Sequence, residues 1–118
     1  MRQILVVEDD DDLREVMALT LMSSGYSIIE ARCGEEALVA IEQAPQPPCL
    51  VLLDLMMPGM SGVQVLDVLR TTGKLERVPV VVLSALADSC RPPGAVGYVT
   101  KPVARDKLLG IVRTCSSH

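Results

Sequence analysis

Five polar residues, each at or just beyond the end of an apolar run, could together carry out phosphoryl transfer. They are Glu8, Asp9, Asp54, Ser84 and Lys101. Carboxylates brought close together repel one another, and a hard divalent cation with oxygen ligands, such as Mg²⁺, relieves that repulsion. Lys101 could neutralise one phosphoryl oxygen and Ser84 could donate a hydrogen bond to another, and phosphoryl transfer mainly needs such positioning and charge stabilisation. Asp54 would be the nucleophile and would form an acyl phosphate.

The apolar runs that carry these residues predict the strands of a parallel sheet. Runs without alternation indicate strands buried on both faces, and a shorter mixed segment indicates an edge strand. The predicted strands are Ile4–Val7, Tyr26–Ala31 at an edge, Cys49–Leu53, Val78–Ala85 and Ala95–Val99. An ionised carboxylate in an apolar setting is costly unless something compensates it. Asp54 is therefore expected either to meet a partner or to lie just past its strand in solvent.

Apolar residues at helical spacing lie between the predicted strands. In the first such segment Val16 and Met17 belong to the repeat, Asp11 or Asp12 is expected to cap the helix, and Gly25 follows as a stop signal. Asp10 is expected to contribute only peripherally to the acidic group.

A later helical segment begins with Ser61 and Gln64, which fit a capping box. The alternation of strand and helix repeats five times along the chain. Such alternation predicts a doubly wound α/β domain, with helices on both faces of a five-stranded parallel sheet. In sheets of this kind, sites form beyond the carboxyl ends of the strands, which is where the five polar residues fall.

Composition excludes several classes of function. The chain has 118 residues, which predicts a single domain spanning residues 1–118. Aromatic residues are 2% of the chain and the net charge is −4, so neither a nucleic-acid surface nor membrane insertion is expected. The first apolar run is too short for a signal peptide or a membrane span. The four cysteines form no C-x-x-C pair, which favours reduced thiols in a cytoplasmic protein over a zinc site.

Four stretches together carry a family resemblance. ILVVEDD, DLMMPGMSG, VVLSA and GYVTKP occur in this order along essentially the whole chain, each at the end of a predicted strand. The chain resembles the CheY-like receiver domains of two-component response regulators. The resemblance implies a flavodoxin-like fold with the strand order 2-1-3-4-5, and a signalling domain, rather than an enzyme, that catalyses its own aspartyl phosphorylation and dephosphorylation.

The resemblance also implies roles for particular residues. Asp54 would accept phosphate from a histidine kinase or phosphotransfer protein, and Lys101 would contact the phosphoryl group. Ser84 would be the switch hydroxyl and Tyr98 the switch aromatic. A cis peptide bond is expected before Pro102.

The ligands of Mg²⁺ implied by the resemblance are Glu8, Asp9, Asp54 and the backbone carbonyl of Met56. Implied partners are a downstream output domain or protein, with the domain itself a monomer or weak homodimer. One departure from the family lies between Ser84 and Lys101. Pro92-Pro93-Gly94 cannot sustain a helix interior, so the fourth helix is expected to be short, irregular or replaced by a loop.

Other functions stay open beside this one. The domain could be a receiver-like interaction module that is never phosphorylated, although such a module would tolerate loss of the acidic pair or of Lys101, and both are present. A phosphatase of the haloacid dehalogenase type also uses a strand-end aspartate, but it needs a second Asp where this chain has Met56. Flavin binding is disfavoured because a phosphate site needs glycine, hydroxyls and backbone N–H groups rather than an acidic loop.

Overall fold

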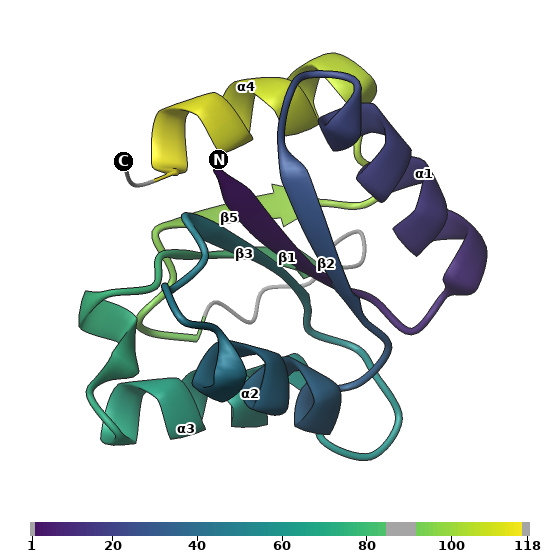
Figure 1. The fold of residues 1–118 in the computed structure, drawn as a ribbon. Helices are drawn as coiled ribbons and strands as arrows, with labels where there is room; N and C mark the ends of the chain where they lie inside the picture. The colour runs from purple at the N-terminus through teal and green to yellow at the C-terminus, as the bar shows by residue number, and fades with distance from the viewer. Residues whose placement is uncertain (1, 85–91, 117–118) are drawn as a thin grey trace.

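A five-stranded parallel sheet forms the middle layer of the molecule, and helices cover both of its faces (Figure 1). The computed structural model describes residues 2–84 and 92–116. The strands are β1 (Gln3–Val7), β2 (Ser27–Ala31), β3 (Leu50–Asp54), β4 (Val80–Ser84) and β5 (Gly97–Thr100). Their order is β2-β1-β3-β4-β5 and every neighbouring pair is parallel. The predicted fold and the edge position of β2 are confirmed.

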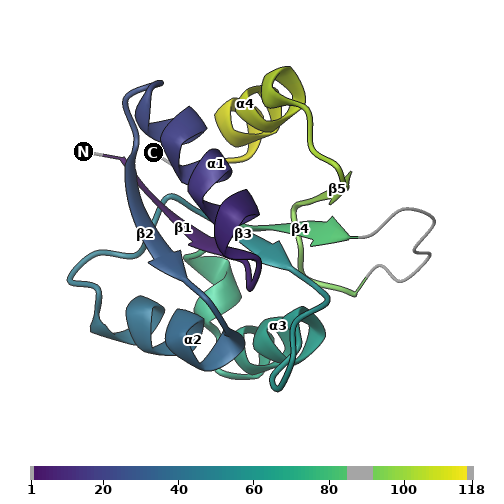
Figure 2. The same cartoon turned by 90° about the vertical axis from the view of Figure 1, so that its right-hand side faces the viewer.

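The helices divide between the two faces of the sheet. They are α1 (Asp11–Met22), α2 (Gly34–Gln43), α3 (Gly62–Thr71) and α4 (Arg105–Cys115), with a short 3₁₀ turn, η1 (Lys74–Glu76). Figures 1 and 2 show α1 and α4 on one face and α2 and α3 on the other. Along β1, Ile4 and Val6 belong to the core beneath α1 and α4, whereas Leu5 and Val7 belong to the core beneath α2 and α3. Both faces are therefore buried, which is why the strand sequences do not alternate.

The local signals for helices were partly correct. Ser61 and Gln64 form the predicted capping box at the start of α3. In α1, Met17 and Leu21 are buried, but Val16 has 60% of its surface exposed. Val16 precedes Met17 by about 100° around the helix, so it lies outside the narrow stripe that faces the sheet. Gly25 follows α1 with a φ of 94°, as a stop signal requires.

The prediction of a short or irregular fourth helix falls mainly on residues 85–91, which lie outside the described residues. Beyond them, residues 92–96 form a turn rather than a helix, with Gly94 at a φ of 104°. The label α4 therefore denotes the last helix of the chain. Among residues 2–84 and 92–116, no helix has the length and apolar character needed to cross a lipid bilayer.

Candidate functional site

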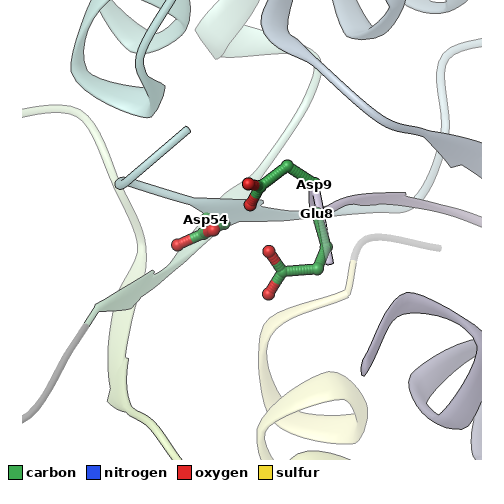
Figure 3. A group of neighbouring side chains, drawn as sticks. All are labelled: Glu8, Asp9 and Asp54. Carbon is green, nitrogen blue, oxygen red and sulfur yellow. The ribbon is translucent and has the colours of Figure 1, made fainter. Parts of the chain in front are cut away.

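Three carboxyl groups come together at the carboxyl end of the sheet. Glu8 and Asp9 follow β1, and Asp54 is the last residue of the neighbouring strand β3. One oxygen from each carboxylate lies within 4.8 Å of the others, and Figure 3 shows the three side chains gathered where the strands end. Glu8 is fully buried, Asp54 is 2% exposed and Asp9 is exposed. Asp54 thus belongs to its strand instead of lying past it in solvent.

Lys101 compensates the two buried carboxylates. Its Nζ lies 2.5 Å from Glu8 Oε1 and 3.1 Å from Asp54 Oδ1. Its backbone N–H donates to the carbonyl of Ser84 at 2.7 Å, which continues the β4–β5 pairing beyond Thr100. The peptide bond between Lys101 and Pro102 is cis, as predicted. A buried carboxylate is tolerated only with such pairing, so the ammonium group is the compensation that Asp54 needs within the protein.

The charges in this site do not balance. Burial and the nearby Asp54 raise the pKa of Glu8, although Lys101 acts in the opposite direction. Burial lowers the pKa of Lys101, but its bonds with Glu8 and its attraction to Asp54 outweigh burial and raise that pKa overall. The ammonium group of Lys101 pairs with Glu8 and Asp54, and Asp9 adds a third carboxyl group to the same cluster. Each of the three side chains offers a carboxyl oxygen to the cluster. Such a donor set fits a hard divalent cation such as Mg²⁺.

The loop after β3 orients the carboxylate of Asp54. The backbone N–H of Met56 donates to Asp54 Oδ1 at 3.2 Å, while the Met56 side chain is 68% exposed. The backbone N–H of Gly62 donates to the carbonyl of Leu55 at 3.1 Å, which brings the start of α3 against the end of β3. A Cβ atom on Gly62 would lie 2.4 Å from the Asp54 carbonyl oxygen. Glycine is thus required where α3 meets the strand that carries Asp54.

Replacing Gly62 by alanine should displace the backbone at Asp54 or Leu55, because a Cβ has no space there. We expect Gly62→Ala to lower the free energy of unfolding by about 1–3 kcal/mol, the usual range for overpacking. Gly110→Ala is the matched control, since a Cβ there meets nothing within 4 Å. It should be neutral or stabilising by up to about 1 kcal/mol, because alanine is the better helix former. Urea denaturation measures both, and equal effects would contradict the steric assignment.

Two further predicted residues lie on β4 and β5. Ser84 is the last residue of β4, is 9% exposed, and pairs in register with Thr100. The Tyr98 hydroxyl donates to the carbonyl of Pro92 at 2.5 Å, and its ring packs against the core beneath α2 and α3. This bond ties β5 to the turn that precedes it. The switch roles of Ser84 and Tyr98 stay predictions.

In the acidic run after β1, the residue that caps α1 differs from the predicted one. Asp10, and neither Asp11 nor Asp12, caps α1: its carboxylate accepts from the backbone N–H groups of Asp12 at 3.0 Å and Leu13 at 3.1 Å. The expectation for Asp11 or Asp12 was wrong because the helix already begins at Asp11, and the cap must be the extended residue before it. Asp11 instead pairs with Arg14.

Sequence comparison decides the family. A family model described as "Response regulator receiver domain" matches residues 4–113. The chain belongs to this family. Among the relatives of this receiver domain, the DNA-binding response regulator MtrA of Mycolicibacterium smegmatis is 40% identical, covering 96% of this chain and 50% of the relative. The transcriptional regulatory protein KdpE of Mycobacterium tuberculosis is 41% identical, with the same coverage of both chains. The receiver domain thus spans about half the length of these curated relatives.

Solved structures agree with this assignment. The response regulator TrrA of Thermotoga maritima, solved in complex with Mg²⁺-BeF, matches with a TM-score of 0.83 and 34% identity, covering 97% of this chain and 98% of that one. The chemotaxis protein CheY4 of Vibrio cholerae matches with a TM-score of 0.85 and 26% identity, covering 98% of each chain. The chain is therefore a CheY-like receiver domain of the two-component response regulators, and the predicted family is confirmed.

Proposed function

We propose that this receiver domain accepts a phosphoryl group on Asp54 from a histidine kinase or phosphotransfer protein and passes the signal to an output domain or protein. The observation that carries the proposal is the geometry around Asp54: a buried carboxylate at a strand end, 3.1 Å from Lys101 Nζ and within 4.8 Å of two other acidic side chains. The test is intact-mass spectrometry after incubation with Mg²⁺ and acetyl phosphate, with Asp54→Asn beside the wild type.

The proposed reaction is a transfer between two nucleophiles. An oxygen of the Asp54 carboxylate attacks the phosphorus of a phosphohistidine on the donor; a P–O bond forms and the P–N bond breaks. The imidazole leaves with the electron pair and takes up a proton, and Asp54 becomes an acyl phosphate. Lys101 holds a positive charge beside the transferred group, and Ser84 donates a hydrogen bond to it. In the dephosphorylation step, water attacks the same phosphorus, a new P–O bond forms and the bond between phosphorus and the Asp54 oxygen breaks. Inorganic phosphate and a proton are released, and the Asp54 carboxylate is restored. The same residues would act in both steps, so the domain would catalyse its own phosphorylation and dephosphorylation.

Glu8, Asp9 and Asp54 would hold Mg²⁺, together with the backbone carbonyl of Met56. When bound, the cation would offset negative charge on the phosphoryl oxygens. The imbalance of one ammonium group against three carboxyl groups supports this proposal. We further propose that residues 1–118 act as one receiver domain, as a monomer or weak homodimer. A cytoplasmic location stays a prediction.

Binding of Mg²⁺ should stabilise the folded domain, because the carboxylates converge only in the native state. At ten times its dissociation constant, the cation should add about 1.4 kcal/mol to the free energy of unfolding. Asp9→Asn should lose most of this gain while folding normally, since Asp9 is exposed. Asp12→Asn is the matched control: it removes an exposed carboxylate from the same acidic run, outside the clustered group.

Thermal unfolding with and without MgCl₂ measures the effect. If Asp9→Asn and Asp12→Asn lose the stabilisation by Mg²⁺ equally, the stabilisation comes from the general negative charge of the domain and not from a defined site. No shift in the wild type at millimolar Mg²⁺ would contradict the metal assignment and favour an interaction module that is never phosphorylated.

A further inference from the structure

Arg14, near the start of α1, joins three separate segments of the protein. Its Nη1 donates to the backbone carbonyl of Glu8 at 2.9 Å, and its Nη2 to Asp11 Oδ1 at 2.6 Å. Its Nε donates to Glu30 Oε1, on the edge strand β2, at 3.1 Å. Only 11% of the side chain is exposed. Each of the three guanidinium nitrogens thus donates a hydrogen bond. A lysine ammonium is a compact point charge and cannot reproduce this arrangement of three separate donors.

The contact with the Glu8 carbonyl fixes more than one oxygen atom. That oxygen belongs to the peptide unit that joins Glu8 to Asp9, and the atoms of a peptide unit lie in one plane. Anchoring the oxygen therefore orients both α-carbons from which the two acidic side chains depart. On the N-terminal side of the Glu8 α-carbon, the backbone N–H of Glu8 donates to the carbonyl of Ala31 at 3.1 Å. The backbone is consequently held on both sides of the Glu8 α-carbon, and the second of these bonds fixes the peptide unit that leads to Asp9.

The helix itself does not depend on Arg14 for its place. Asp10 caps α1, and Met17, Ala18 and Leu21 bury its inner face in the core. The contacts of Arg14 instead connect the helix and β2 to the loop between β1 and α1. They act on the part of the chain that carries two of the three clustered carboxylates.

We propose that Arg14 is a positioning residue for the cation site, which sets the directions of the Glu8 and Asp9 carboxylates through the peptide unit between them. This inference rests on the proposed binding of Mg²⁺ at that site. Residues that orient the ligands of a metal typically change its affinity by about 10- to 100-fold when they are replaced.

The sign of the effect separates positioning from simple charge. Arg14 carries a positive charge near the carboxylates, so charge alone predicts that Arg14→Gln binds Mg²⁺ more tightly than the wild type. Positioning predicts the opposite, because the carboxylates lose their fixed directions. Arg14→Lys keeps the charge but loses the three-point contact, so positioning predicts weaker binding there as well.

The experiment is isothermal titration with MgCl₂ of the wild type, Arg14→Gln, Arg14→Lys and a control, Arg70→Gln. Arg70 is a half-exposed arginine on α3 that pairs with Asp67, three residues before it, much as Arg14 pairs with Asp11. We expect both Arg14 variants to bind Mg²⁺ about 10-fold more weakly or worse, and the control to match the wild type. Circular dichroism before each titration shows whether the variant is folded.

A milder variant keeps the test decisive if the Arg14 variants unfold. Glu30→Asp keeps the negative charge but shortens the side chain, so it weakens the contact with Arg14 Nε and leaves the Glu8 carbonyl bond in place. Charge alone predicts unchanged Mg²⁺ binding in this variant, whereas positioning predicts binding that is weaker by a smaller factor than in the Arg14 variants. Unchanged or tighter Mg²⁺ binding in a folded Arg14→Gln, or wild-type affinity in Arg14→Lys, would overturn this inference. The proposed Mg²⁺ site itself would still stand. Unchanged binding in Glu30→Asp would also overturn the inference if the Arg14 variants do not fold. No Mg²⁺ binding by the wild type would overturn the proposed metal site together with the inference.

Discussion

Asp54→Asn should take up no phosphoryl group from acetyl phosphate in the presence of Mg²⁺, whereas the wild type should gain one. The amide of asparagine is a poor nucleophile, so the acceptor is lost. The fold should be kept, because asparagine has the same shape and relieves the repulsion between Asp54 and Glu8. Its carbonyl oxygen can still accept the bond that the Met56 N–H now donates to Asp54 Oδ1. Intact-mass spectrometry measures uptake, and thermal unfolding measures whether the fold is kept.

The matched control is Asp67→Asn, which removes an exposed carboxylate on α3 and should be labelled like the wild type. Labelling of Asp54→Asn at the wild-type stoichiometry would mean that the acceptor is another residue. If the wild type takes up no phosphoryl group from acetyl phosphate or from a phosphorylated histidine kinase, the unphosphorylated interaction module becomes the better explanation.

Lys101→Met should cause the largest loss of stability among the site variants when Mg²⁺ is absent. Its ammonium lies between two buried carboxylates, and the variant leaves them together without a cation. Removing one partner from a buried ion pair typically costs about 3–5 kcal/mol. We expect a value near the lower end, about 3 kcal/mol, because 22% of the Lys101 side chain is exposed and Glu8 can take up a proton.

The same variant should respond more strongly to Mg²⁺ than the wild type does, because no ammonium group competes for the carboxylates. It should nevertheless take up phosphate from acetyl phosphate more slowly, since the charge beside the transferred group is gone. Urea denaturation with and without MgCl₂ measures stability. Lys107→Met, at an exposed position of α4, is the control and should be close to neutral. Equal stability of the two variants would show that the buried carboxylates do not depend on Lys101.

Local patterns in the sequence were enough to predict the sheet and the ends of its strands. The uninterrupted apolar runs predicted β1, β3 and β4, because strands covered on both faces need no polar side. The polar residues that follow these runs predicted the cluster of Glu8, Asp9 and Asp54, since parallel strands present their carboxyl ends at one edge. The capping box of α3 is equally local, because its two residues are three positions apart.

Other features depend on how distant segments pack, and no local spacing reveals them. The bond from Lys101 to Glu8 joins residues 93 positions apart, and the bond from Arg14 to Glu30 joins a helix to the edge strand. The sequence alone offered no reason to single out Gly62. Only glycine fits at this position because the start of α3 packs closely against the backbone of Asp54. Periodicity shows which face of an element is apolar, whereas distances between side chains on different elements follow from register and close packing. The rule of the strand ends placed Lys101 at this edge of the sheet, but its pairing with Glu8 and Asp54 was decided by the tertiary structure. The same holds for the bond from Arg14 to Glu30 and for the close packing at Gly62.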